Sequence, residues 1–395
     1  MRSLSLRCAP WILSAFVLQA CREGSDIRVG DFTPVVPSPS GTQGCGPSTP
    51  VPGTVTPVFT SAVIGPLSQI AATADVETVE RLYLTGEGAS IHQLDFPLGG
   101  GPLMMDTEWV APGVIESALP AGIAGPAEIS GIAVFDNLFL VVAEHASNTL
   151  MTVRRDVQNS VALLAGLPSA TGGFSDGAGG GIRFHFTAPV PLLASAFGTI
   201  YVGDTENHAL RLVAVGGIPV SSTIAGTGSP GAPDGTEDPL STTHLDTPSG
   251  IATTCPGEVL LLVSGQAGIG GRRLLSLAIG GVSAFGGFDG SSLVLAGDGT
   301  DATTQGIDRT AQLGAPQGLA ATRDGLVFWI DAKDGILRRY DVATGISDCP
   351  LFLDCAEAVT AGGSFSGSHF AMALGDSGAL YVLEADQETL HRVDP

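Results

Sequence analysis

The feature that most constrains this chain is internal repetition, which is the sequence signature of solenoids and propellers. A short β-rich stretch built around an aromatic residue or a leucine recurs six times, at intervals of 53 to 67 residues. The six central residues are Tyr83, Leu140, Tyr201, Leu261, Phe328 and Tyr381. Such intervals are too long for helical-hairpin or leucine-rich repeats, whereas they suit four-stranded blades with long loops. We therefore expect an all-β fold, a six-bladed β-propeller of four-stranded antiparallel blades over residues 57–395.

The end of the chain predicts how the ring closes. The sixth repeat stops soon after its third strand, Leu390–Val393, so its blade lacks an outer strand. Val58–Ile64 directly precedes the first inner strand and has the apolar residues to supply the missing one. We expect this N-terminal strand to complete the C-terminal blade, because the alternative, an open arc of six units, leaves two unpaired sheet edges.

The clearest repeat carries a family resemblance. Residues 198–211 read Gly-Thr-Ile-Tyr-Val-Gly-Asp-Thr-Glu-Asn-His-Ala-Leu-Arg, and Ile-Ala-Gly-Thr-Gly follows at 224–228. These motifs resemble the NHL repeat of bacterial β-propeller proteins of the cell envelope, and the resemblance covers about residues 57–395. Asn-His itself occurs only at 207–208, so the other copies keep the apolar frame of the repeat without its signature. The resemblance implies a rigid disc whose loops present a binding surface.

Residues 1–20 have the pattern of an export signal. Arg2 and Arg7 flank an apolar run that ends in Leu-Gln-Ala-Cys at 18–21 and is too short to span a bilayer as a mature helix. The tetrapeptide resembles the bacterial lipobox, which implies lipidation of Cys21; the alternative is an ordinary signal peptide cleaved nearby. Residues 21–56, rich in Pro, Ser and Gly, are expected to form an extended spacer. We expect an exported lipoprotein of the cell envelope, at the outer membrane or cell surface, that touches the membrane through its lipid anchor only.

Export makes the remaining cysteines candidates for disulfide bonds. Apart from the signal and the anchor, four cysteines remain, and four cysteines allow three pairings. Cys349 and Cys355 close a short loop and are expected to pair locally, in which case Cys45 would pair with Cys255 and attach the spacer to the domain. A zinc site is the alternative, but no Cys-x-x-Cys pair accompanies these residues.

The charge balance excludes one class of partner. The chain has a formal net charge of −22 at pH 7, and Lys333 is its single lysine. A strongly acidic surface repels phosphate, so we do not expect nucleic-acid binding.

Three histidines are candidates for a transition-metal site. His185 and His244 each precede an apolar residue that leads into an inner strand, and His369 lies ahead of another inner strand in a different register. Loops that enter inner strands rim the central channel of a propeller, so these residues could converge there. Neutral imidazoles bind zinc and copper. The alternative is that all three are ordinary loop histidines.

Carboxylates give a weaker signal for calcium. Asp176, Asp234 and Asp298 each precede a glycine, and the repeats place them in equivalent loops. Asp-Gly is a turn dipeptide in the first place, yet Asp234 with Asp238, and Asp298 with Asp301, could hold calcium through oxygen ligands. Four other acids follow the second strand of a blade and are expected to accept backbone amide hydrogen bonds in the turns: Glu144, Asp204, Asp331 and Glu384.

No sequence motif establishes catalysis. The chain contains neither a Walker loop nor a His-Glu-x-x-His motif. We therefore favour a binding or scaffold module for a protein, peptide or glycan partner, with no cofactor required. The alternative is a propeller enzyme, lactonase-like or amidating-lyase-like, with a metal at the channel mouth, and the fold alone does not separate the two.

Overall fold

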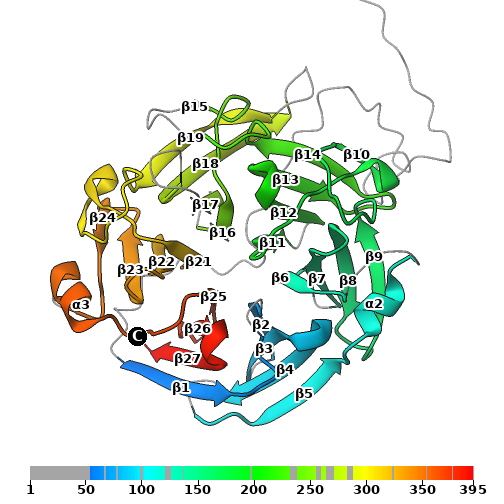
Figure 1. Cartoon of the computed structure of the whole chain (residues 1–395), viewed down its shortest axis with the longest axis horizontal. Coiled ribbons are helices and arrows are strands. Elements are labelled where there is room, and N and C mark those ends of the chain that lie inside the picture. The colour runs from blue at the N-terminus through cyan, green and yellow to red at the C-terminus, as the bar shows by residue number, and fades with distance from the viewer. Residues whose placement is uncertain are drawn as a thin grey trace, which may run out of the picture.

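The repeats fold into six antiparallel sheets arranged as a ring around a central channel (Figure 1). This computed structural model describes residues 54–394, except for 66–67, 77–78, 98–100, 121–125, 137, 196–197, 232–237, 255–258, 264–270, 283–287, 323, 353 and 376. In each sheet an inner strand lies at the axis and the strands that follow it along the chain continue outward, which confirms the predicted six-bladed β-propeller. We number the blades 1 to 6 along the chain.

Blades 1 and 2 have four strands each. Blade 1 comprises β2 (Ile70–Val76), β3 (Val79–Gly86), β4 (Ser90–Pro97) and β5 (Met105–Val110). Blade 2 comprises β6 (Ile129–Val134), β7 (Phe139–Glu144), β8 (Thr149–Arg154) and β9 (Val161–Ala165).

Blades 3 to 5 repeat this plan and add one short strand each. Blade 3 comprises β11 (Leu192–Ser195), β12 (Thr199–Asp204), β13 (Ala209–Ala214), β14 (Val220–Ala225) and the additional β10 (Gly177–Ala178). Blade 4 comprises β16 (Pro248–Thr253), β17 (Val259–Val263), β18 (Arg273–Val282), β19 (Phe288–Ala296) and the additional β15 (Asp238–Pro239). Blade 5 comprises β21 (Pro316–Ala321), β22 (Leu326–Asp331), β23 (Ile336–Asp341), β24 (Ile346–Asp348) and the additional β20 (Gly306–Ile307).

The additional strands correct the expectation of four strands in every blade. Each lies in the loop that precedes the inner strand and pairs with the outer strand of the same blade. The loop thus reaches across to the rim and covers part of a sheet edge that would otherwise present unpaired backbone groups.

Blade 6 confirms the predicted closure of the ring. Its strands β25 (Phe370–Leu374), β26 (Leu380–Glu384) and β27 (Thr389–Asp394) come from the C-terminal end, and β1 (Thr54–Thr60) pairs antiparallel with β27. Figure 1 shows β1 outside β27 at the rim. The bounds differ from the expected Val58–Ile64, because β1 begins inside the segment assigned to the spacer, and the amide of Ile64 instead donates to the Ser61 carbonyl in a turn.

The blades pack face to face through apolar side chains. Between blades 6 and 1, for example, Leu82 and Leu84 of β3 form one buried cluster with Tyr381 and Leu383 of β26. The two short helices, α2 (Val114–Ala118) and α3 (Cys355–Ala361), lie at the periphery (Figure 1). Within the described residues, none of the helices has the length and apolar character needed to cross a membrane.

One predicted disulfide lies within the described part of the chain and is confirmed. Cys349 and Cys355 are bonded, and both residues are buried. The bond joins the segment after β24 to the start of α3. The other predicted pair, Cys45 with Cys255, and the proposed lipidation site Cys21 lie outside the described residues.

Candidate functional site

The inner strands of the six blades enclose a narrow channel. One apolar side chain from each of them lines a cavity of about 80 Å³: Ile70, Ile132, Leu192, Ile251, Leu319 and Met372. None of the residues around this cavity carries a carboxylate or a positive charge. Among its described lining residues the channel therefore offers apolar side chains, backbone groups and the polar side chains of Gln69 and Ser249, but no acid–base pair.

A small recess lies at one mouth of the channel. It has a volume of about 20 Å³, which is room for one group the size of a water molecule. Residues from blades 1, 3, 5 and 6 line it: Ser68, Gln69, Ala188, Pro189, Gln317, His369 and Phe370. Its polar side chains are hydroxyl, amide and imidazole groups, so the recess is a hydrogen-bonding site without a carboxylate.

Gln317 fixes two blades at this mouth. Its Oε1 accepts a hydrogen bond from the Phe370 amide at 2.9 Å, and its Nε2 donates to the Ser368 carbonyl at 3.0 Å. Both ends of this amide are therefore used in joining blade 5 to blade 6. The side chain of Gln69, by contrast, makes no hydrogen bond to any described residue, and its amide is free to meet a ligand.

His369 is held at the recess by a chain of hydrogen bonds. Its Nδ1 lies 3.0 Å from the Ser368 hydroxyl, which lies 2.9 Å from Oδ2 of Asp386, in the turn between β26 and β27. Although partial burial works against ionisation, hydrogen bonds from the Ser368 amide and hydroxyl and from the His369 amide hold the pKa of Asp386 below its usual range. Asp386 is thus a carboxylate, and it orients His369 through Ser368.

The structure does not bring the three candidate histidines together. The His185 amide donates to Oδ1 of Asp204 at 2.8 Å, and its ring packs so closely on Gly172 that a Cβ there would lie 2.6 Å from the ring. His244 places its Nδ1 3.1 Å from the Thr227 hydroxyl. Over the described part of the chain, no three histidine, cysteine or acidic residues form a group that could hold a metal ion.

The calcium candidates are also separated. Oδ1 of Asp301 lies 3.1 Å from Nζ of Lys333 and 3.3 Å from Arg272, whereas Asp298 accepts hydrogen bonds from Thr300 and Gln312. Asp238 lies in β15, on the rim of blade 4, and Asp234 is outside the described residues. Asp298 and Asp301 therefore bond to neighbouring protein groups.

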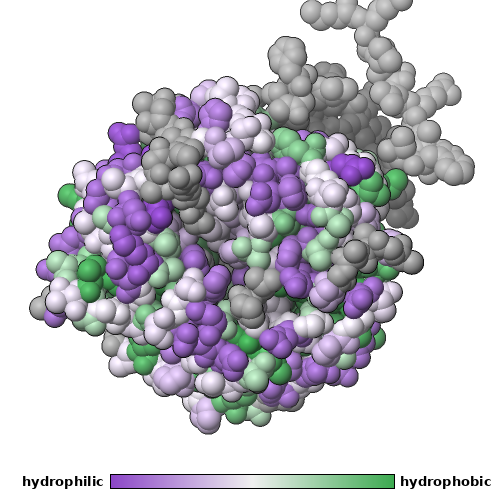
Figure 2. Space-filling view, viewed as in Figure 1, coloured by the Kyte–Doolittle hydropathy of each residue, from purple (hydrophilic) through white to green (hydrophobic). Residues whose placement is uncertain are grey.

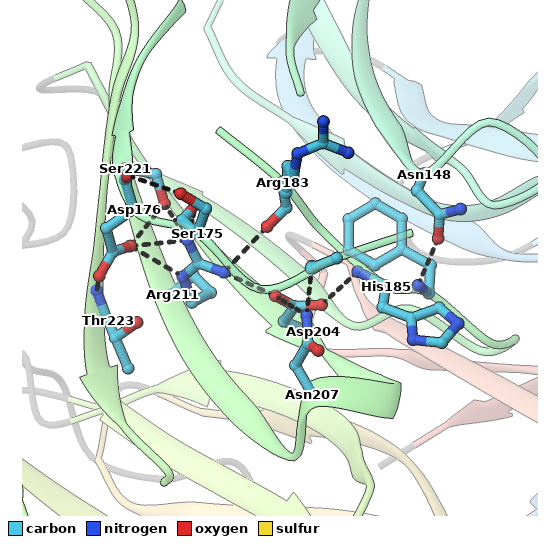
Figure 3. Close-up of polar contacts among 12 residues, drawn as sticks. Asn148, Ser175, Asp176, Arg183, His185, Asp204, Asn207, Arg211, Ser221 and Thr223 are labelled. Atoms are coloured by element: carbon cyan, nitrogen blue, oxygen red, sulfur yellow. Dashed lines mark hydrogen bonds and ion pairs between the residues drawn. The ribbon is translucent and has the colours of Figure 1, made fainter. Parts of the chain in front are cut away.

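The acids after the second strands do accept backbone amides, and most also bind a base. Figure 3 shows this in blade 3, where Oδ2 of Asp204 lies 2.7 Å from Nη1 of Arg211. The same pair recurs as Asp331–Arg338 at 3.1 Å in blade 5 and as Glu384–His391 at 2.8 Å in blade 6. Glu144, which faces no such base, accepts the amides of Glu128 and Ser147.

Two of these pairs lie wholly inside their blades. Asp204, Arg211, Asp331 and Arg338 have fully buried side chains. Burial raises the pKa of Asp204 to about 6 and that of Asp331 to about 6, although the neighbouring arginines act in the opposite direction. Burial also lowers the pKa of Arg338. The strongly shifted groups hold the structure together and form no reactive pair in a cleft.

Asp176 completes the pair in blade 3. Its Oδ1 lies 2.6 Å from Nη2 of Arg211, and its Oδ2 accepts the amide of Thr223 (Figure 3). Asp176 and Asp298 do lie in equivalent loops, each between the outer strand of one blade and the inner strand of the next, but at different positions: Asp176 directly precedes β10, whereas Asp298 comes just after β19.

Ser175 lies beside this carboxylate in Gly-Phe-Ser-Asp-Gly, at 173–177. The order matches Gly-x-Ser-x-Gly, but the segment leads into β10, where a nucleophile elbow would lead from a strand into a helix. The Ser175 hydroxyl donates to the Asp176 carbonyl.

The base of each pair was missed in the sequence, although a signal exists. Arg211, Arg338 and His391 each stand seven residues after their acid, which places both side chains across one strand–turn–strand unit. Sequence analysis also missed Asp386, the carboxylate that orients His369 through Ser368. Its partners Ser368 and His369 lie 18 and 17 residues earlier, so no local spacing joins them.

Comparison with known proteins supports the fold only. No family model and no curated protein matches the chain. Among solved structures, it is similar to a gluconolactonase from Xanthomonas campestris, with a TM-score of 0.51 and 13% identity over 89% of this chain and 98% of that one. It is also similar to an auxiliary nutrient binding protein from Bacteroides thetaiotaomicron, with a TM-score of 0.50 and 10% identity over 85% and 69% of the two chains. Such distant likeness, to a binding protein and to an enzyme alike, establishes a propeller fold.

Proposed function

We propose that this protein is a binding module of the NHL-repeat type, exported as a lipoprotein and anchored at the outer membrane or cell surface through Cys21. Its ligand would be a protein, peptide or glycan that meets the mouth of the channel. The proposed location rests on the signal-like residues 1–20, and the spacer would hold the disc away from the membrane.

The observation that supports a binding role is the set of uncharged polar side chains at the channel mouth. The recess offers amide, hydroxyl and imidazole groups from blades 1, 5 and 6 beside apolar side chains from blade 3, and Gln317 joins blades 5 and 6 there. Recognition by a few fixed polar groups in a concave site is typical of ligand binding. The carboxylate of Asp386, which is linked to His369 through Ser368, is engaged with the Ser368 hydroxyl and with backbone amides.

A metal-dependent enzyme, the alternative that the sequence left open, finds less support in the described residues. A catalytic metal needs several oxygen or nitrogen ligands from the protein around one point. Of the described side chains that line the recess, the imidazole of His369 is the one nitrogen ligand, and it is joined only by a hydroxyl and two amides, one of which, Gln317, already bonds to blade 6.

The test is a ligand screen that measures both binding and any chemical conversion of the bound ligand. We expect the purified full-length protein to bind at least one envelope glycan, peptide or protein in calorimetric titrations, and to release it chemically unchanged in mass spectra of the recovered ligand. Conversion of a lactone or ester at a rate that depends on a stoichiometric bound metal would contradict the proposal and favour the enzyme.

A further inference from the structure

We propose that His369 is the hydrogen-bond acceptor for a hydroxyl group at the channel mouth, and that the ligand of this protein is a neutral glycan. The proposal rests on the binding function proposed above and narrows it to one ligand class. It follows from the directions of two hydrogen bonds, the size of the recess and the uncharged side chains among its described lining residues.

The hydrogen bonds fix which ring nitrogen of His369 carries the proton. An ionised carboxylate only accepts hydrogen bonds, so the single hydrogen of the Ser368 hydroxyl belongs to the bond with Oδ2 of Asp386. The Ser368 oxygen must therefore accept at its other contact, and Nδ1 of His369 must be the donor there. A neutral imidazole protonated at Nδ1 has a bare Nε2, which can only accept a hydrogen bond.

Blade 3 contains a similar bond without the histidine. There the Thr187 hydroxyl donates to Oε1 of Glu206 at 2.7 Å, again linking the loop before the inner strand to the turn after the second strand. The next residue is Ala188, which lines the same recess. The same hydroxyl–carboxylate bond thus occurs in blades 3 and 6. In blade 6 the hydroxyl, that of Ser368, also contacts the imidazole of His369.

The recess fits a hydroxyl group in size and in polarity. Its 20 Å³ hold one water-sized group. A sugar hydroxyl donates its proton and accepts another through the same oxygen, so it can satisfy Nε2 of His369 and the free amide of Gln69 together. A peptide group carries its donor and its acceptor on separate atoms that point in opposite directions, which suits a single water-sized recess less well.

The surroundings favour a ligand without charge. No described residue that lines the recess or the channel cavity is an arginine, a lysine or an acid, and the protein as a whole is strongly negative. An anionic glycan would therefore find no cation at the mouth and would be repelled by the overall charge.

The first test determines which nitrogen of the His369 ring carries a proton. In the full-length protein labelled with ¹⁵N-histidine, long-range proton–nitrogen spectra are expected to show His369 protonated at Nδ1 and bare at Nε2. Ser368→Ala should release this preference, whereas Ser366→Ala, which removes a hydroxyl bonded to Glu384 in the same loop, should leave it unchanged. A proton on Nε2 in the unmodified protein would overturn the proposal.

The second test uses three neutral oligosaccharides, cellohexaose, maltohexaose and xylohexaose, with hexagalacturonate as the charged counterpart. At least one neutral hexaose should bind and shift the Nε2 resonance of His369. His369→Ala should weaken that binding about tenfold, the usual value of one hydrogen bond, and Asp386→Asn about threefold. His244→Ala, an exposed histidine on another blade, should leave it unchanged.

The outcomes separate this inference from the binding function. Equal affinity in the His369→Ala variant would overturn the role of His369 and leave binding intact. Binding of hexagalacturonate alone, or of a peptide or protein in place of any hexaose, would overturn the neutral-glycan inference while the binding function stands. Absence of any ligand in the screen and in this test would overturn both.

Discussion

Replacing Arg211 with alanine is expected to lower the free energy of unfolding by about 3–5 kcal/mol. Arg211 is fully buried and contacts two carboxylates, Asp204 and Asp176, as well as the carbonyl of Ser175. Its removal leaves Asp204 buried without a counter-charge, which costs more than the pair itself contributes. Urea unfolding followed by tryptophan fluorescence and circular dichroism measures the difference.

The size of this loss should depend on pH. Burial already raises the pKa of Asp204 to about 6, and without Arg211 it rises further. A carboxyl group whose pKa is raised in the folded state stabilises that state when protonated, and this contribution is lost as the pH rises through the folded pKa. The variant should therefore lose less stability at pH 5 than at pH 8.

Arg154→Ala provides the matched control. Arg154 pairs with Asp156 at 2.6 Å, but both side chains are 43% exposed. Its loss should lower the free energy of unfolding far less than the loss of Arg211 does, at either pH, because an exposed ion pair contributes little. Similar losses in the two variants would contradict a structural role for the buried pair.

Removal of β1 is expected to have the second large effect. A chain that starts at Ser61 lacks the outer strand of blade 6 and exposes the edge of β27 along its whole length. It also loses the packing of Val55, Val58 and Phe59 against the clusters of the closing blades. We expect a loss of about 4 kcal/mol from these apolar contacts and a tendency to associate through the free edge.

A chain that starts at Thr54 is the control for this truncation. It keeps β1 and, like the chain that starts at Ser61, lacks Cys45 and the rest of the spacer before Thr54, so the comparison of the two truncations isolates the effect of β1, and the control should unfold at the higher temperature. Differential scanning calorimetry and light scattering compare the two. A truncation at Ser61 that unfolds at the same temperature as the control would show that the N-terminal strand does not hold the ring closed.

The architecture could be predicted because a similar segment recurs six times in the sequence. Six similar segments, none able to bury its apolar face alone, must stack on one another, and the missing strand at Pro395 requires a partner from the other end. The residue at which this N-terminal strand begins was harder to predict, because a proline at position 57 suggests that the strand starts after it. As the outer strand of its sheet, β1 tolerates the proline, with an irregularity in pairing between Pro57 and Phe59.

The short strands β10, β15 and β20 could not be predicted, since two residues give no periodic pattern. Their positions depend on how far each loop reaches across its own blade. The same reason explains why Asp176 and Asp298 occupy different positions within equivalent loops. Both precede glycine, but the strands place Asp176 beside Arg211 and Asp298 beside Gln312.

The candidate site was predicted only in part. His369 was correctly placed ahead of an inner strand, but its relation to His185 and His244 was inferred from loop position alone. The recess takes its other members from blades 1, 3 and 5, far from His369 in sequence. Such convergence depends on ring geometry and on contacts such as Gln317 to Phe370, which sequence spacing does not reveal.

The central claim is that the channel mouth binds the ligand, and blocking that mouth tests it most directly. Ala188→Trp places a large side chain at the recess, whereas Ala162→Trp places the same side chain on β9, where Ala162 is exposed at the rim. The measurement is the dissociation constant of the ligand found in the screen for the two variants and the unmodified protein. The account predicts a loss of tenfold or more, about 1.4 kcal/mol, for Ala188→Trp and no change for Ala162→Trp. Unchanged affinity in Ala188→Trp, or a loss confined to Ala162→Trp, would contradict binding at the mouth.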